Sequence, residues 1–297
     1  MQTFDNSTDI STEMDGPDSI QDAVPSTGAL TESYINVTSP TKLSNLTLVD
    51  TFERHAHKFP NKDALVVADI DLNKRECLSF KEWHRQSDNL AASLIRLGLT
   101  NGDAVAMVIP NRIEHPVAWM AALKANLVPC FLSLSRKSGD DLKLSLNDLK
   151  ARAVIILRKA DHIDREFNEV TRRVFETVCT SEYDADLPHV KSVICIGKTM
   201  KGASDFHNLI KDTGREDTDA LSNHKALITA ESICAVYQTS GTTGRPKHVV
   251  HRHFGIVNSY RFIAKRKRIN AEDRYFSDLP MSWGAGLAGL FHCMVTG

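Results

Sequence analysis

Segments with helical spacing alternate with short apolar segments from Leu46 onward, and this alternation constrains the fold more than any other feature. One helix is predicted to begin at Ser79, with Glu82 three residues later as in a capping box, and to end at Gly98. Further elements are expected as strands over 104–109, 128–132, 154–157 and 193–196, and as a helix over 140–150. Another helix is expected after Asn111, which is predicted to act as a cap because Glu114 lies three residues later. The pattern predicts an α/β fold in which helices flank a parallel or mixed sheet.

Composition excludes several classes of protein. The chain has 297 residues, 42% hydrophobic and 25% charged, with a net charge of -1. Its length suggests about two domains, and its charge gives no reason to expect nucleic acid or an anionic membrane as a partner. The six cysteines form no Cys-x-x-Cys pair, which argues against a structural zinc site and a disulfide scaffold. Reduced thiols and a cytoplasmic location follow as expectations. Peripheral membrane or organellar association and the oligomeric state stay open.

The longest uncharged stretch, residues 279–297, is long enough to raise the question of a membrane span. Glycines, a proline and polar residues interrupt it, so a buried loop followed by a helix is predicted instead. No apolar segment follows a basic one near the first residue, so no secretory signal is expected.

Residues 1–45 differ in composition from the rest. They hold seven acidic residues and one basic residue, they are rich in Ser, Thr, Asp, Asn and Pro, and they show no periodicity. Such a segment cannot bury enough apolar surface to offset the entropy lost on ordering. A disordered acidic tail is therefore predicted over residues 1–45, followed by one folded region over 46–297.

The run Tyr237–Lys247, with sequence YQTSGTTGRPK, carries the chemistry. A short apolar segment leads into it and Val249-Val250 follows, which predicts a strand, a loop and a second strand. Glycines let the backbone approach a ligand closely, and backbone N–H groups and hydroxyls can converge on one anion. With an arginine and a lysine supplying positive charge, polyphosphate is the expected ligand.

The spacing differs from the P-loop of nucleotide hydrolases, because Gly241 and Gly244 are only three residues apart and Lys247 follows a proline. The run instead resembles the phosphate-binding signature of the adenylate-forming superfamily, which includes acyl-CoA synthetases, luciferases and peptide-synthetase adenylation domains. His248 departs from that pattern, which has glycine or a small residue there. An ordinary Ser/Thr/Gly surface turn is the alternative reading.

The resemblance implies a fold, a reaction and ligands. It implies the N-terminal part of an adenylate-forming domain, with mixed parallel sheets flanked by helices. It implies that a carboxylate, most naturally a fatty acid, attacks ATP to give an acyl-adenylate, which CoA then intercepts, with Mg²⁺ assisting. The residues implied to bind ATP are Thr239, Ser240, Gly241, Thr242, Thr243, Gly244 and Lys247. No catalytic residue and no metal ligand is assigned.

A second segment, residues 279–286, resembles a family motif that borders the acyl pocket, and it implies a substrate pocket at Trp283 and Gly284. Trp283 stands where the family has histidine, and the alternative is a Trp that anchors a core turn. His248, His251 and His253 are expected on one strand face as phosphate-loop donors or surface residues rather than metal ligands. The basic cluster of Arg261, Lys265, Arg266, Lys267 and Arg268 is expected to be a solvated helix end, and a nucleic-acid or phosphate patch is the alternative.

The resemblance covers residues 46–297 and implies parts that lie beyond them: an adenine-binding Tyr-Gly-x-Thr-Glu element, a ribose-binding aspartate, a hinge and a mobile domain with a catalytic lysine. Three hypotheses therefore stay open. The chain is the N-terminal portion of an acid–CoA ligase, a non-catalytic nucleotide-binding remnant, or a truncated product. Acting alone, the 297 residues are expected to be inactive as a ligase.

We predict that amides in residues 1–45 exchange with solvent almost without protection, because this segment lacks the apolar residues that a fold requires. Hydrogen–deuterium exchange followed by mass spectrometry measures this directly. Slow exchange across residues 20–37 would show that the segment folds or docks.

Overall fold

A seven-stranded sheet in the order β7-β6-β5-β3-β4-β8-β9 organises the chain, as seen in a computed structural model that describes residues 41–69, 74–132, 139–158, 165–180, 184–211, 215–239 and 247–296. Residues 44–297 form one compact unit. The predicted tail lies almost wholly outside the described residues. The strands of this sheet are β3 (Ala104–Val108), β4 (Val128–Phe131), β5 (Ala153–Arg158), β6 (Ser192–Gly197), β7 (Ser204–Asp205), β8 (Ile233–Thr239) and β9 (Lys247–Arg252).

All described neighbours in this sheet pair in parallel except β8 and β9, which form an antiparallel pair at one edge. A separate antiparallel ribbon consists of β1 (Asp63–Asp69) and β2 (Lys74–Ser79). The mixed, mainly parallel sheet that the sequence predicted is confirmed, and the strands over 104–109, 128–132, 154–157 and 193–196 are in place.

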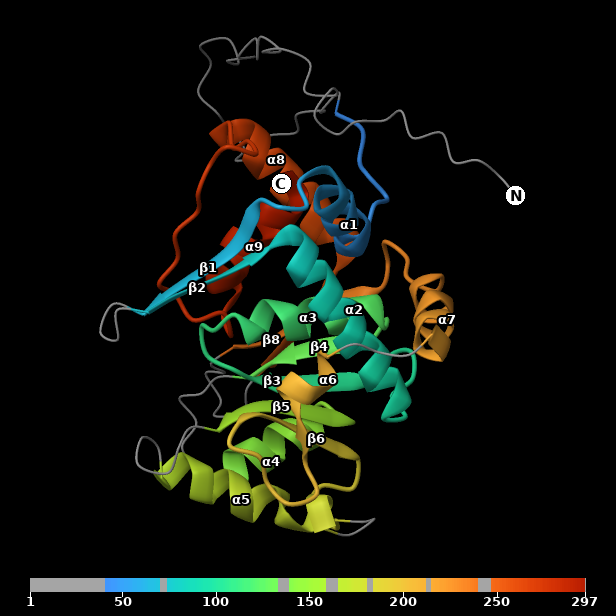
Figure 1. Ribbon diagram of the computed structural model, residues 1–297, viewed down its shortest axis with the longest axis vertical. Coiled ribbons are helices and arrows are strands. Elements are labelled where there is room, and N and C mark those ends of the chain that lie inside the picture. Colours follow the sequence, from blue (N-terminus) through green and yellow to red (C-terminus); the bar gives the residue numbers. More distant parts are fainter. Residues whose placement is uncertain are drawn as a thin grey trace, which may run out of the picture. The chain divides into compact units, whose positions relative to one another are not determined.

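Helices cover both faces of the sheet (Figure 1). The helices are α1 (Leu48–Lys58), α2 (Phe80–Arg96), α3 (Glu114–Lys124), α4 (Gly139–Asp148), α5 (Arg165–Thr180), α6 (Phe206–Leu209), α7 (Arg215–Lys225), α8 (His253–Lys267) and α9 (Gly284–Thr296). Helix α3 lies over β3 and β4 on one face, and α4 and α5 lie on the other.

Successive strand residues point to opposite faces, so each strand supplies two cores. Met107, Phe131 and Ile155 belong to the larger core with α1, α2 and α3, whereas Ala106 and Ile156 belong to the smaller core with α4 and α5. Burial on both faces explains why these strands read as nearly continuous apolar runs rather than as alternating ones.

Helix α2 begins where the sequence predicted, and Gly98 follows it with φ of +87°. The Ser79 hydroxyl accepts a hydrogen bond from the Glu82 amide at 3.2 Å. The reciprocal half of the predicted capping box is wrong, because the Glu82 carboxylate accepts from Arg85 and Gln86 instead. These two side chains, three and four residues along the helix, occupy the carboxylate.

Two buried tryptophans fix helices to the backbone of other segments. The Trp83 indole N–H donates to the Pro116 carbonyl at 3.1 Å, and the Trp119 indole N–H donates to the Cys234 carbonyl at 2.9 Å. Both side chains are fully buried, so each pairs its only donor while its ring fills the core. The second bond ties α3 to β8, which lies 115 residues further along the chain.

The C-terminal helices agree with two expectations. Helix α8 ends in Lys265, Arg266 and Lys267, with Arg268 in the left-handed conformation, so the basic cluster is a helix end as predicted. Helix α9 follows a loop within the uncharged stretch, as predicted. The expectation that this loop is buried is wrong, because Leu279, Pro280 and Trp283 are exposed. No helix in the described part of the chain combines the length and the apolar character that crossing a membrane requires.

We predict that Leu90→Ala lowers the free energy of unfolding by roughly 2–5 kcal/mol, because Leu90 on α2 is fully buried and its removal leaves a cavity. Urea denaturation measures the loss. The control, Leu227→Ala, changes a leucine that is 55% exposed and should cost less than about 0.5 kcal/mol. Equal losses in both variants would contradict the packing described here.

Candidate functional site

The hydroxyl- and glycine-rich loop joins β8 to β9. Thr239 is the last residue of β8, Lys247 is the first residue of β9, and the two lie directly opposite each other in the antiparallel register. Opposite residues in such a ladder share a face, so both exposed side chains lie on the same face where the loop begins and ends. The other predicted loop residues, Ser240, Gly241, Thr242, Thr243 and Gly244, lie outside the described residues.

The next ladder pair carries a side-chain hydrogen bond. Gln238 lies opposite His248, and Gln238 Nε2 and His248 Nε2 are 3.1 Å apart. This contact was not predicted from the sequence. The spacing could have indicated it, because two polar residues that flank a hairpin loop at equal distances from its centre must face each other.

The expectation that His248, His251 and His253 share a strand face is wrong. His248 and His251 are three residues apart, an odd number that places them on opposite faces of β9, and His251 packs against the Tyr237 ring. Strand β9 ends at Arg252, so His253 is helical, and its Nδ1 accepts from the Leu48 amide at 3.1 Å. Burial lowers the pKa of His253 to about 4, so it is a neutral core residue.

The described ends of the loop, Thr239 and Lys247, lie at the carboxyl edge of the sheet. Strands β3, β4 and β8 are adjacent and parallel, so their last residues, Val108, Phe131 and Thr239, lie along one edge. Open α/β sheets bind ligands in the crevice outside the carboxyl ends of their strands. The position of the loop therefore suits a binding site.

Asn111 follows β3 and connects a second sequence motif to this edge. Its side-chain Nδ2 donates to the Leu279 carbonyl at 2.8 Å, and its Oδ1 accepts from the Met281 amide at 2.7 Å. The expected cap-like role of Asn111 is therefore wrong: α3 begins at Glu114, behind Ile113, with no side-chain cap. Instead, the Leu279 carbonyl and the Met281 amide satisfy the donor and the acceptor of the Asn111 side chain.

Trp283 and Gly284 lie just beyond the segment that Asn111 holds. The Trp283 side chain is 53% exposed, and Gly284 begins α9 with open space where a Cβ would stand. Trp283 is therefore not a core anchor. Gly286 is different, because a Cβ there would lie 2.1 Å from the Pro280 carbonyl oxygen. The absence of a side chain at Gly286 permits a tight turn. The Pro280 carbonyl fills the space beside it, so no room is left there for a substrate.

A row of three stacked rings connects β8 with β4 and α3. Phe131 stacks on Tyr237 with centroids 5.2 Å apart, and His115 stacks on Phe131 at 5.4 Å. Burial lowers the pKa of His115 to about 4, so its imidazole is neutral at physiological pH. These buried rings give the base of the loop a rigid support.

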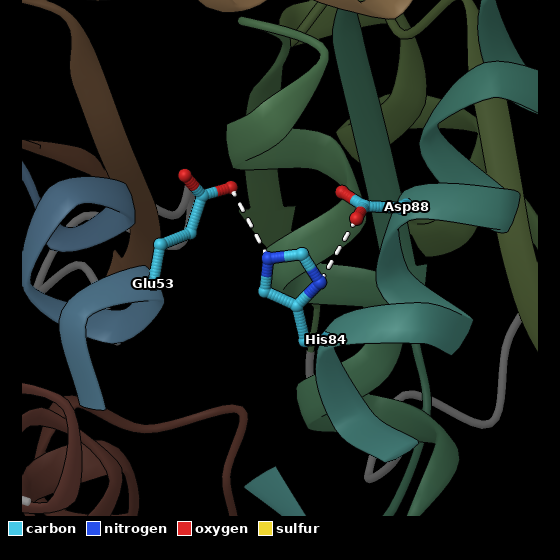
Figure 2. Close-up of side chains that lie close together, drawn as sticks. All are labelled: Glu53, His84 and Asp88. Atoms are coloured by element: carbon cyan, nitrogen blue, oxygen red, sulfur yellow. Dashed lines mark ion pairs between the residues drawn. The ribbon is translucent and has the colours of Figure 1, made fainter. Parts of the chain in front are cut away.

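A second cluster of ionisable side chains lies among the helices. Glu53, His84 and Asp88 each place one ligand atom within 4.8 Å of the others, and Figure 2 shows the imidazole between the two carboxylates. The distances are 2.9 Å from His84 Nδ1 to Asp88 and 3.6 Å from His84 Nε2 to Glu53. By donor chemistry alone, this set could hold a divalent metal ion.

Two lysines already occupy the carboxylates of this cluster. Lys225 Nζ lies 2.7 Å from Glu53 and 3.0 Å from Asp88, and Lys124 Nζ lies 2.9 Å from Asp88. Their ammonium groups supply the positive charge that a metal ion would bring. We therefore interpret the cluster as an ion-pair network that links α1, α2, α3 and α7.

The network perturbs the pKa values of its members. Burial would raise the pKa of Asp88, but His84, Lys124 and Lys225 together hold it well below its usual range. Burial lowers the pKa of Lys124 to about 8 despite the nearby Asp88 carboxylate. Burial also opposes the charge on Lys225, yet Asp88 and Glu53 raise its pKa overall.

A profile of the AMP-binding enzyme family matches residues 52–297. The chain belongs to the AMP-binding enzyme family. Among curated relatives, the mitochondrial medium-chain acyl-CoA ligase ACSF2 of Rattus norvegicus is 24% identical over 245 residues, which are 81% of this chain and 39% of that protein. The 4-hydroxybenzoate–CoA/benzoate–CoA ligase of Rhodopseudomonas palustris is 25% identical over 222 residues, 75% of this chain and 37% of that protein.

Solved structures show the same fold. Acetoacetyl-CoA synthetase from Streptomyces lividans superposes with a TM-score of 0.70 at 20% identity, over 85% of this chain and 37% of that one. A long-chain-fatty-acid–CoA ligase from Archaeoglobus fulgidus superposes with a TM-score of 0.69 at 19% identity, over 89% of this chain and 48% of that one. The predicted membership of the adenylate-forming superfamily is confirmed. The chain spans about two fifths of the length of the curated relatives it matches.

We predict that the free energy of unfolding of the parent increases relative to that of the Lys124→Met variant as pH rises from about 7.5 to 10. The folded pKa of Lys124 is about 8, below the roughly 10.4 of an unfolded lysine, so the unfolded state binds more protons in this window. Stability tied to Lys124 therefore grows with pH. Urea denaturation across this pH range measures the difference.

The matched control is Lys225→Met, because the pKa of Lys225 is raised rather than lowered. Stability tied to Lys225 is fully present below the unfolded pKa and is lost only as pH rises above it. The difference in unfolding free energy between the parent and Lys225→Met should therefore stay constant up to about pH 10. If the difference in unfolding free energy between the parent and Lys124→Met also stays constant over this pH range, the lowered pKa of Lys124 is contradicted.

Proposed function

We propose that this chain supplies the ATP-triphosphate site of a carboxylic acid–CoA ligase that acts through an acyl-adenylate. The observation that carries the proposal is the closure of the Thr239–Lys247 loop by the β8–β9 ladder at the carboxyl edge of the sheet. The family match and the CoA ligases among the relatives support it.

The proposed site combines one cation with several hydrogen-bond donors. Lys247 contributes an ammonium at one end of the loop and Thr239 a hydroxyl at the other, and both side chains are solvent-exposed. Ser240, Thr242 and Thr243, with the amides of Gly241 and Gly244, complete the proposed set. Transfer of an adenylyl group is promoted mainly by positioning the phosphates and stabilising their charge, which these groups can do.

The acid substrate is proposed to lie beside Trp283 and Gly284. Asn111 fixes this segment to the edge that also carries the loop, so the acid and the phosphates would meet outside the ends of β3, β4 and β8. A fatty acid is our first choice, since a relative of this chain bears the name medium-chain acyl-CoA ligase, and an aromatic acid is the alternative from the benzoate–CoA ligase.

ATP and CoA are proposed as co-substrates and Mg²⁺ as cofactor, all three on family grounds. We assign Mg²⁺ and CoA no residue of this chain. The cytosol is the proposed compartment, because the described cysteines are all free thiols. A mitochondrial location is the alternative that the printed name of the rat relative suggests.

We predict that Lys247→Ala weakens acyl-adenylate formation by about 1.5–3 kcal/mol, because it removes a charge-assisted contact to phosphate. The assay is ATP–pyrophosphate exchange in a protein that carries this segment together with the further length its relatives possess. The control is Lys267→Ala, which removes an exposed lysine from the far end of α8. If both variants exchange at the parental rate, the loop does not hold the triphosphate.

A further inference from the structure

The segment between α8 and α9 exposes large apolar side chains. Phe276 is 84% exposed, more than any other large hydrophobic side chain in the described part of the chain, and its neighbour Tyr275 is 54% exposed. Both belong to no helix or strand, and Figure 1 shows the segment as an open trace between the two helices. Aromatic side chains are enriched where proteins contact one another, so this segment is a candidate interaction surface.

The segment is held at both ends, whereas its middle has free backbone groups. The Asp273 carboxylate accepts a hydrogen bond from the Asn270 amide at 2.9 Å, and the Leu279 carbonyl accepts one from Asn111 at 2.8 Å. Between these points, residues 274–278 form no backbone–backbone hydrogen bond with any described residue. Unpaired backbone donors and acceptors in a row are a template for another strand.

The side chains of Tyr275 and Phe276 differ in their surroundings. The Tyr275 ring packs against α9, where a Cβ at Gly289 would lie 2.4 Å from a carbon of that ring. In a paired strand, successive side chains point to opposite sides. The exposed side chains of Arg274, Phe276 and Asp278 would therefore share the side that faces away from α9.

The order of these three side chains is self-complementary in an antiparallel pair. When two copies of the segment pair about a twofold axis at Phe276, Arg274 of each copy lies opposite Asp278 of the other, and the two Phe276 rings adjoin. An axis at Tyr275 would instead place Glu272 opposite Asp278, a pair of like charges. The charges therefore favour the register centred on Phe276.

We propose that residues 274–278 are an interaction surface for a second copy of this chain, which adds an antiparallel strand centred on Phe276. The inference goes beyond the proposed function and does not rest on it. One pair of short strands is a small interface, so the dimer is weak and its formation depends on protein concentration. The alternative partner is another strand, from the further length that the relatives of this chain possess.

The experiment is sedimentation velocity of the 297-residue chain from low to high micromolar concentration. Arg274→Asp makes the opposed positions 274 and 278 both acidic, and Asp278→Arg makes them both basic. The matched control is Arg266→Asp, which reverses an exposed charge on α8 outside the segment. Circular dichroism checks that each variant is folded, which is expected because all three side chains are exposed.

The parent and Arg266→Asp should show the same monomer–dimer equilibrium. Arg274→Asp and Asp278→Arg should each raise the Kd of the dimer about tenfold or more, because symmetry converts two ion pairs into two like-charge pairs. An equal mixture of these two variants should dimerise like the parent, because acidic positions of one variant then lie opposite basic positions of the other. Phe276→Ser should also weaken the dimer, since it removes the central aromatic pair.

Three results would overturn the proposal. A parent that stays monomeric at every concentration shows that a second copy is not the partner of this segment. A dimer that neither charge reversal weakens is joined through another surface. If the mixture of Arg274→Asp and Asp278→Arg dimerises no better than each variant alone, the antiparallel register centred on Phe276 is wrong. None of these results bears on the ATP site, which Lys247→Ala tests separately.

Discussion

The parallel pairing of β4 with β8 is the contact on which the candidate site depends. It joins Cys130 and Phe131 to Val236 and Tyr237, residues more than one hundred positions apart, and so places the start of the loop beside the ends of β3 and β4. The Trp119 indole and the stacked rings of Phe131 and Tyr237 hold this seam through a buried hydrogen bond and aromatic packing. Because closely packed protein interiors deform little, β8 gives the loop a fixed point of attachment.

The helical layer around that seam carries a charge network instead of an all-apolar contact. Lys124 is fully buried at the end of α3, where it pairs with Asp88 of α2 and lies over the Phe52 ring of α1. Ion pairs of this kind cost desolvation, so they are weak evidence of stability. Their geometry is nevertheless specific, and Lys225 extends it to α7, the last helix before β8.

The topology brings Asn111, Thr239 and Lys247 to the same edge of the sheet. Asn111 follows β3 and binds the backbone at Leu279 and Met281, while the hydroxyl- and glycine-rich loop follows β8 at the same edge of the sheet. Parallel strands place all such connections on one side, which lets residues from distant parts of the chain line one crevice.

The sequence by itself determined the α/β class, most element positions and the family, because hydrophobic periodicity and the glycine–hydroxyl spacing are local properties of the chain. It could not determine the strand order, the ion-pair network, the role of Asn111 or the Gln238–His248 bond. The errors have the same origin. Glu82 and Asn111 were assigned local partners, and His253 was assigned to a strand that ends one residue earlier. Polar side chains choose among partners that only the tertiary structure brings within reach, whereas apolar periodicity is already present in the order of the residues.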